Sequence, residues 1–276
     1  MTKTMTIGLS GALLLTASAA AVLAQQPAAP PAMPSSMSAA GRMISTPGYL
    51  PKGAVPDSLL LNPAPPASGS PAEARDVAAA EAAAALRGTP RWALATQDAD
   101  LSATTVGTTF SCAAGFRIDA ASTPKLNALL LRAAADLGRS TAPTKRKYMR
   151  PRPFMVNGRQ SCTPDAEGVL RSDGSYPSGH SALGWGWSLI LAEAVPDRAA
   201  QIVARGRSFG DSRRICNVHW LSDIEEGRVV ASAVVARLNA EPEFQADLAA
   251  ARAEAAAAAG KEPAGDCAAE AALLAL

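Results

Sequence analysis

The chain has 276 residues, of which 48% are hydrophobic, and it carries a formal net charge of +2. That length is enough for one domain with a sizeable hydrophobic core. The near-neutral charge argues against a nucleic-acid-binding protein, because such a protein presents a strongly basic surface to the phosphate backbone.

The first 24 residues are typical of a secretory signal peptide. Lys3 gives a short basic start, the segment 7–23 is apolar, and small residues precede Gln25 where a signal peptidase would cleave. We therefore expect a periplasmic or secreted mature chain with no membrane association after signal cleavage. A retained membrane anchor is the alternative, although the apolar run is short for a membrane span.

The rest of the chain divides by composition. Residues 25–48 form a leader rich in Pro and Ala, without periodicity, which we expect to be disordered. Residues 49–248 are predicted to form a single domain that opens with a Pro-rich extended arm. Residues 249–276 form an Ala-rich C-terminal tail that contains Cys267.

Helical periodicity follows the arm, and no run of alternating residues predicts a strand. Thr123 and Pro124 are typical of a helix start, and Gly138 is expected to end that helix. Further helices are predicted at 72–87, 90–100, 182–194, 196–209, 223–238 and 243–259. The apolar segment 182–194 is expected at the centre of the core. The predicted fold is all-α, a single-domain helical bundle.

Four cysteines follow the predicted signal peptide, and in an oxidising compartment they can form two disulfides with three connectivities. Chain order alone favours Cys112–Cys162 and Cys216–Cys267. The sequence contains no CxxC pair, so we do not expect a structural zinc site.

Residues able to carry chemistry gather in three blocks. The blocks are Lys145 to Pro153, Pro177 to His180, and Ser212 to Asp223. In the second block a turn leads into a helix, so Ser178 can cap that helix and Gly179 lets a ligand approach the backbone closely. The unpaired amide groups and the dipole at a helix N-terminus favour an anion there.

The composition of these blocks indicates phosphoryl transfer. The cations that can neutralise charge on the phosphoryl oxygens are Lys145, Arg152 and Arg213. His219 can attack phosphorus with one ring nitrogen while Asp223, at i+4 and expected on the same helix face, holds the other. His180 can protonate the leaving oxygen as general acid. Because His180 must be protonated and His219 neutral, we expect an acid pH optimum.

The blocks resemble the signature of the phosphatidic-acid-phosphatase type 2 (PAP2) superfamily, which also contains the vanadium haloperoxidases. That signature is Lys, six residues, Arg-Pro; then Pro-Ser-Gly-His; then Ser-Arg, five residues, His, three residues, Asp, and every position is matched. The stretch Gly174 to His180 looks like that of class A bacterial non-specific acid phosphatases, and Asp57 to Leu61 resembles their N-terminal arm. The resemblance covers about 49–248. Ser181 stands where Thr is more familiar, and the cysteine-bearing tail is extra.

The resemblance implies a role for each matched residue. His219 is the nucleophile that forms a phosphohistidine, Asp223 orients it, and His180 is the acid. The implied phosphate-binding residues are Lys145, Arg152, Ser178, Gly179, His180 and Arg213. The resemblance also implies a site without metal or cofactor that acts on small-molecule phosphate monoesters with broad specificity. Homo-oligomerisation is left open.

Several alternatives stay open at this point. A vanadium haloperoxidase or a phosphotransferase could use the same site, and an anion-binding protein could keep it without catalysis. A membrane lipid phosphatase would need several apolar spans of about 20 residues. His180, His219 and Asp223 could hold a metal, but the nearby cations would repel it. The basic residues expected to be solvated or rim charges are Arg146, Lys147, Arg150, Arg159 and Arg214.

Overall fold

The structure, a computed structural model, describes residues 1–2, 47–51, 53–102 and 104–274. The predicted signal peptide and leader lie outside these residues, apart from their ends. The described part of the chain contains no strand and no helix that is long and apolar enough to cross a membrane. The all-α prediction is therefore confirmed.

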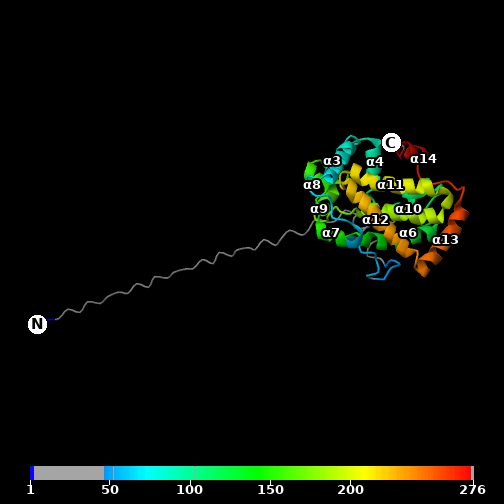
Figure 1. The fold of residues 1–276 in the computed structure, drawn as a ribbon, viewed down its shortest axis with the longest axis horizontal. Coiled ribbons are helices and arrows are strands. Elements are labelled where there is room, and N and C mark those ends of the chain that lie inside the picture. The colour runs from blue at the N-terminus through cyan, green and yellow to red at the C-terminus, as the bar shows by residue number, and fades with distance from the viewer. Residues whose placement is uncertain (3–46, 52, 103, 275–276) are drawn as a thin grey trace. The chain divides into compact units, whose positions relative to one another are not determined.

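Short and long helices follow one another along the described chain (Figure 1). Their bounds are α2 (Ser58–Leu61), α3 (Pro71–Ala84), α4 (Pro90–Gln97), α5 (Thr105–Ala114), α6 (Pro124–Ser140), α7 (Ala142–Tyr148), α8 (Pro153–Asn157), η1 (Pro164–Ala166), α9 (Glu167–Leu170), α10 (Gly179–Ala194), η2 (Pro196–Arg198), α11 (Ala199–Ile215), α12 (Leu221–Leu238), α13 (Pro242–Ala258) and α14 (Cys267–Leu274). Helix α6 does not end at Gly138 as predicted. A glycine inside a helix costs only about 1 kcal/mol relative to alanine, which the buried face of α6 can offset.

Helix α10 lies at the centre of the core, as its apolar sequence predicts. It contacts α6, α11, α12 and α13, which surround it in Figure 1. Trp187, Ile190 and Leu191 are completely buried along it. A Cβ atom on Gly206 of α11 would lie 2.3 Å from the Ser188 Oγ atom of α10. A glycine there therefore lets α10 and α11 approach each other closely.

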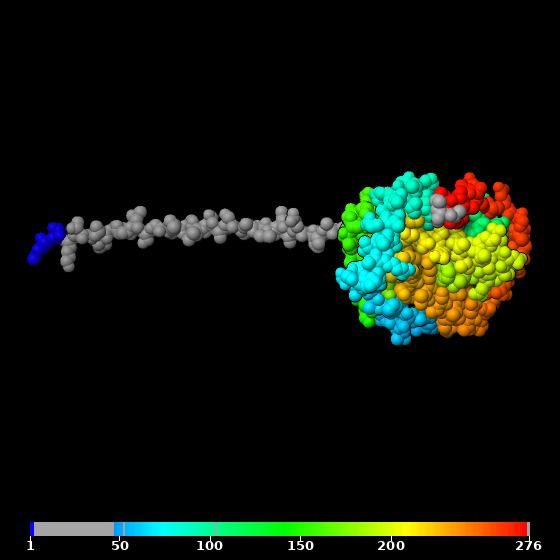
Figure 2. All heavy atoms as spheres, turned by 45° about the horizontal axis from the view of Figure 1, so that its top comes forward, coloured from blue at the N-terminus to red at the C-terminus, as the bar shows by residue number. Residues whose placement is uncertain are grey.

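The N-terminal arm packs over the surface of the bundle, beside α7 and α12 (Figure 2). Its residues Tyr49 and Leu50 are buried against the main core. The arm is not wholly extended, because Asp57 caps the single-turn helix α2 by accepting a hydrogen bond from the Leu59 amide at 2.9 Å. Asn62 then donates to the Glu226 carboxylate on α12 at 2.8 Å. These contacts hold the arm against the helix that carries one end of the site.

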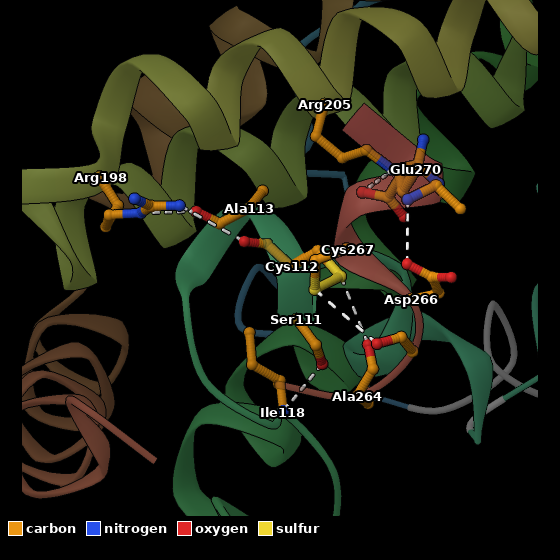
Figure 3. The surroundings of a disulfide bond; sticks show 12 residues. Ser111, Cys112, Ala113, Ile118, Arg198, Arg205, Ala264, Asp266, Cys267 and Glu270 are labelled. Atoms are coloured by element: carbon orange, nitrogen blue, oxygen red, sulfur yellow. Dashed lines mark hydrogen bonds and ion pairs between the residues drawn. A yellow bond between two sulfur atoms is a disulfide. The ribbon is translucent and has the colours of Figure 1, made fainter. Parts of the chain in front are cut away.

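The disulfides connect Cys112 to Cys267 and Cys162 to Cys216, so the pairing predicted from chain order is wrong. The fold decides the pairing by proximity. The Cys162 amide donates to the Cys216 carbonyl at 3.2 Å, which places the two Cα atoms 4.8 Å apart. Cys112 on α5 meets Cys267 at the start of α14, as Figure 3 shows. This second bond joins the C-terminal segment to the bundle, and α14 itself contains no buried residue.

Candidate active site

The Pro177 to His180 turn forms the N-terminus of α10. Ser178 caps the helix, since its Oγ atom accepts a hydrogen bond from the Ser181 amide at 3.2 Å. The Ser178 amide in turn donates to the Asp223 carbonyl on α12 at 2.8 Å. A Cβ on Gly227 of α12 would lie only 2.5 Å from the Ser178 carbonyl oxygen. Glycine at that position therefore lets α12 lie directly against the turn.

His219 and Asp223 are paired, but they do not share a helix face as predicted. His219 precedes α12, which begins at Leu221, and Asp223 lies in its first turn. The Asp223 Oδ2 atom reaches back to accept hydrogen bonds from the Trp220 amide at 2.9 Å and from His219 Nδ1 at 3.2 Å. A carboxylate only accepts hydrogen bonds, so the proton of His219 sits on Nδ1 and its Nε2 is unprotonated.

Arg150 holds the other oxygen of Asp223, contrary to the prediction that it is a solvated charge. Its side chain is only 11% exposed and donates to Asp223 Oδ1 and to Asp76 Oδ2, each at 2.7 Å. Asp76 is buried on α3 and also accepts from the Ser222 amide at 2.8 Å. The row His219, Asp223, Arg150, Asp76 thus extends from the site to helix α3.

Arg152 and Lys145 lie on the open side of His219. Arg152 donates to the Val218 carbonyl at 3.0 Å, and its Nη1 lies 3.1 Å from His219 Nε2. The Lys145 ammonium donates to the Gly174 carbonyl. Both cations also contact one oxygen of the Asp173 carboxylate, at 3.1 Å for Lys145 and 2.9 Å for Arg152. Two of the three predicted cations are therefore beside the predicted nucleophile.

His180 is the second residue of α10 and is fixed by a carbonyl group. Its Nε2 lies 3.2 Å from the Ala99 carbonyl oxygen, which can only accept, so Nε2 carries a proton and Nδ1 is left for a ligand. The ring stacks on Phe209 at 6.4 Å between centroids. Asp98, which precedes Ala99, is buried and accepts a hydrogen bond from Ser212 Oγ at 2.6 Å.

Arg213 follows Ser212 and is buried behind the site. Its Nη1 has a long contact of 3.7 Å to the Cys216 sulfur. Its Nε has no hydrogen-bond partner among the described residues. An unsatisfied buried guanidinium is costly, which favours an anion as its partner.

Comparisons with known proteins identify the family of this chain. The PAP2 superfamily profile matches residues 125–240. The acid phosphatase of Zymomonas mobilis is 44% identical over 202 residues, which are 72% of this chain and 75% of that protein. The non-specific acid phosphatase of Providencia stuartii is 42% identical over 72% of this chain and 81% of its own length. That of Salmonella typhimurium is 40% identical over 75% and 83%, respectively. The chain belongs to the acid phosphatases of the PAP2 superfamily.

Positive charge dominates the site of this PAP2 acid phosphatase. Burial and the charge of Arg152 lower the pKa of Lys145 to about 8, and burial with the same charge lowers the pKa of Arg213 to about 9. Burial, then Arg152, Lys145 and Arg213, lowers the pKa of His219 well below its usual value. Burial and Arg213 do the same to the pKa of His180. Both rings are therefore neutral in the free protein near neutral pH.

The PAP2 acid phosphatase fold brings all of the predicted site residues to one end of α10. We call this cluster the phosphate end; it comprises Lys145, Arg152, Ser178, Gly179, His180, Arg213, His219 and Asp223. A Cβ on Gly179 would lie 4.0 Å from Lys145 Cε, so this glycine faces the same space as the ammonium stem. No group of three or more His, Cys, Asp or Glu residues in the described chain is arranged to hold a metal ion.

Sequence reasoning missed three contributors to the phosphate end. Asp76 and Asp173 are ordinary acidic residues in the sequence. Only the fold places Asp76 on Arg150, and Asp173 on Lys145 and Arg152. The Ala99 carbonyl is a backbone group with no sequence signal. Arg150 did carry a signal, because Pro151 and Pro153 follow it closely and would break a solvated helix there.

Proposed function

We propose that this PAP2 acid phosphatase hydrolyses phosphate monoesters through a phosphohistidine formed on His219 Nε2. The observation that carries the proposal is the state of this ring. Asp223 holds Nδ1 at 3.2 Å, while Nε2 points at Arg152 at 3.1 Å in a buried cationic site. A neutral imidazole fixed in this tautomer is an oriented nucleophile, and the cations favour the phosphoryl group that it attacks.

In the first step the phosphoryl oxygens bind the cationic side chains and the free amide groups at the start of α10. The P–N bond to His219 Nε2 forms as the P–O bond to the leaving group breaks. His219 then gains positive charge, which the Asp223 carboxylate stabilises through Nδ1–H. His180 donates the proton that the leaving oxygen needs, from Nδ1, because its Nε2–H is engaged by Ala99.

In the second step water attacks the phosphohistidine. His180, now neutral, accepts a proton from that water as the P–N bond breaks and inorganic phosphate forms. His219 returns to its neutral form with the proton on Nδ1. The proton donated in the first step is recovered in the second, so the cycle is complete without a metal or another cofactor.

The proposal includes an acid pH optimum. Burial and Arg213 lower the pKa of His180 in the free enzyme, so the acid form needed for the first step becomes common only at low pH or beside a phosphate anion. The pKa of His219 is lowered as well, so the nucleophile stays neutral in moderately acidic solution. Both requirements are met together on the acid side of neutrality.

The proposal also covers the setting of the enzyme. We propose that residues 1–24 are removed and that the mature chain works in the periplasm or outside the cell on a broad range of monoesters. The two disulfides suit an oxidising compartment, since such bonds do not persist in a reducing cytosol.

The decisive experiment traps the intermediate. The purified mature chain is mixed with p-nitrophenyl phosphate at acid pH, quenched in base and measured by intact-protein mass spectrometry. We expect a mass increase of one phosphoryl group, and its absence in a His219→Asn variant. Turnover is expected to persist in a chelator. An active His219→Asn variant would contradict the phosphohistidine, and loss of activity on chelation would contradict a metal-free site.

A further inference from the structure

Asp173 occupies the two cations that should receive the substrate phosphate. A single carboxylate oxygen, Oδ2, contacts Lys145 Nζ at 3.1 Å and Arg152 Nη2 at 2.9 Å. Charge-assisted bonds of this kind are what a phosphate oxygen would form with the same donors. Oδ2 and a phosphate oxygen therefore compete for one position.

The backbone, and not this carboxylate, sets the place of both cations. Arg152 Nε donates to the carbonyls of Leu170 at 3.0 Å and Asp173 at 3.2 Å, and Nη1 donates to that of Val218 at 3.0 Å. The Lys145 ammonium donates to the Gly174 carbonyl. These four backbone contacts persist if the Asp173 side chain rotates away, so the cations stay ready for another anion.

Exposure identifies the side chain that can move. The Asp173 side chain is 49% exposed, whereas those of Arg152 and Lys145 are 2% and 11% exposed. A half-exposed carboxylate regains water when it leaves its partners, so a pair of this kind contributes only about 0–1 kcal/mol. Lys145 and Arg152, in contrast, cannot move away without breaking their hydrogen bonds to backbone carbonyl groups.

We propose that the Asp173 carboxylate is an internal competitor, which occupies Lys145 and Arg152 in the free enzyme and is displaced into solvent when a phosphate group binds. This rests on the proposed function, because it takes these two cations as phosphate-binding residues. The carboxylate neutralises part of the buried positive charge between turnovers. It also returns to the cations after hydrolysis and so favours release of inorganic phosphate.

The competitor also selects among anions. A dianionic phosphate group gains more from the cationic cluster than a monoanion does, because its Coulomb energy with each cation is larger. Weakly charged anions such as acetate or chloride gain little over the carboxylate already present. Asp173 therefore favours dianionic phosphate groups over singly charged anions.

The test compares Asp173→Asn with Asp165→Asn, an exposed aspartate in η1 of the same connecting segment. Asparagine keeps the size of the side chain and the backbone carbonyls but removes the negative charge. We measure binding of inorganic phosphate by titration calorimetry, and KM and kcat with p-nitrophenyl phosphate. Asp173→Asn should lower both the Kd for phosphate and the KM by about fivefold, while Asp165→Asn changes neither.

A charge-retaining variant completes the design. Asp173→Glu should keep Kd and KM near those of the unaltered chain, and circular dichroism establishes that each variant is folded. If Asp173→Asn does not fold, Asp173→Ser takes its place with the same expectation. Unchanged or weaker phosphate binding in the folded neutral variant overturns the inference. Tighter phosphate binding without hydrolysis in any form would instead leave the inference standing and refute the proposed function.

Discussion

The phosphate end and the C-terminal segment of this enzyme are held in place by different means. At the phosphate end, Arg150 joins Asp223 on α12 to Asp76 on α3 through buried ion pairs. Helix α14 buries no residue and is joined to the bundle by the Cys112–Cys267 bond and by an ion pair between Glu270 and Arg205 at 3.5 Å (Figure 3). In a buried charged network the loss of one member leaves its partners uncompensated, whereas release of an exposed segment leaves the core intact.

The largest effect is expected from Asp223→Asn at the phosphate end. The amide no longer fixes the Nδ1 proton of His219 or stabilises the ring when it becomes positive, so kcat should fall by about 10³- to 10⁴-fold. Steady-state kinetics with p-nitrophenyl phosphate measure this. The control is Asp211→Asn on α11. It removes an ion pair with Arg228 of α12 and should leave kcat within about twofold of the unaltered enzyme. A kcat for Asp223→Asn within tenfold of the unaltered enzyme would contradict the assigned role.

Arg150→Met should show that the network supports stability as well as catalysis. It leaves the carboxylates of Asp76 and Asp223 buried without their cation, which should lower the free energy of unfolding by about 3–5 kcal/mol. Urea unfolding measures the change. Arg146→Met, at an exposed position of α7, should change the stability by no more than about 0.5 kcal/mol. Equal stability of the two variants would show that Arg150 is no more than a rim charge.

Acidification should weaken the fold while it promotes turnover. Because the pKa values of His180 and His219 are lowered by burial and by neighbouring cations, these two rings bind more protons in the unfolded chain than in the folded chain below about pH 6.5. Each histidine should then reduce stability by up to about 1.4 kcal/mol per pH unit as the pH falls from there toward its folded-state pKa. Thermal unfolding between pH 7 and pH 5 measures this loss.

The same experiment contains its own comparison. His180→Asn and His219→Asn should each show a smaller acid loss of stability than the unaltered chain. Inorganic phosphate should restore stability in acid, since its negative charge raises the pKa of both rings. If the substituted chains lost as much stability as the unaltered one, the two histidines would not be the groups responsible.

The smallest effect is expected from Cys267→Ser in the C-terminal segment. Since α14 buries no residue, its release should leave kcat/KM within about twofold while making residues 259–266 sensitive to protease. Cys162→Ser is the matched variant, because Cys216 stands three residues before His219 and its bond fixes that connection. Cys162→Ser should lower both the activity and the melting temperature more than Cys267→Ser does. Equal losses in the two variants would remove the contrast between the regions.

Part of this picture follows from the sequence alone. The helical class, the central position of the 182–194 segment and the gathering of the three blocks at one place were all predicted correctly, because each depends on a local pattern or on matched spacing. The disulfide pairing was predicted wrongly from chain order, since it depends on which α5 and α14 residues meet in space. The contacts of Asp76 and Asp173 could not be predicted either, because they too depend on which residues meet in space.

His219 shows how a correct pairing can rest on an incorrect local structure. The spacing of four residues to Asp223 predicts a shared helix face, yet Trp220 is extended and α12 begins after it. Asp223 reaches His219 because a carboxylate in the first turn of a helix turns back to its unpaired amide groups. Two different backbone arrangements thus give the same contact from the same spacing.

The contacts of Asp98 and Ala99 have a consequence for how sequences of this kind can diverge. Asp98 accepts from Ser212, whose neighbour is Arg213, and the Ala99 carbonyl meets His180. Two consecutive residues after α4 thereby set the spacing between His180 and Arg213. Substitutions of Ala99 should be tolerated, because only its backbone is used. Insertions or deletions between residues 97 and 100 should be rare among active relatives, since a shift of one residue would misalign both contacts.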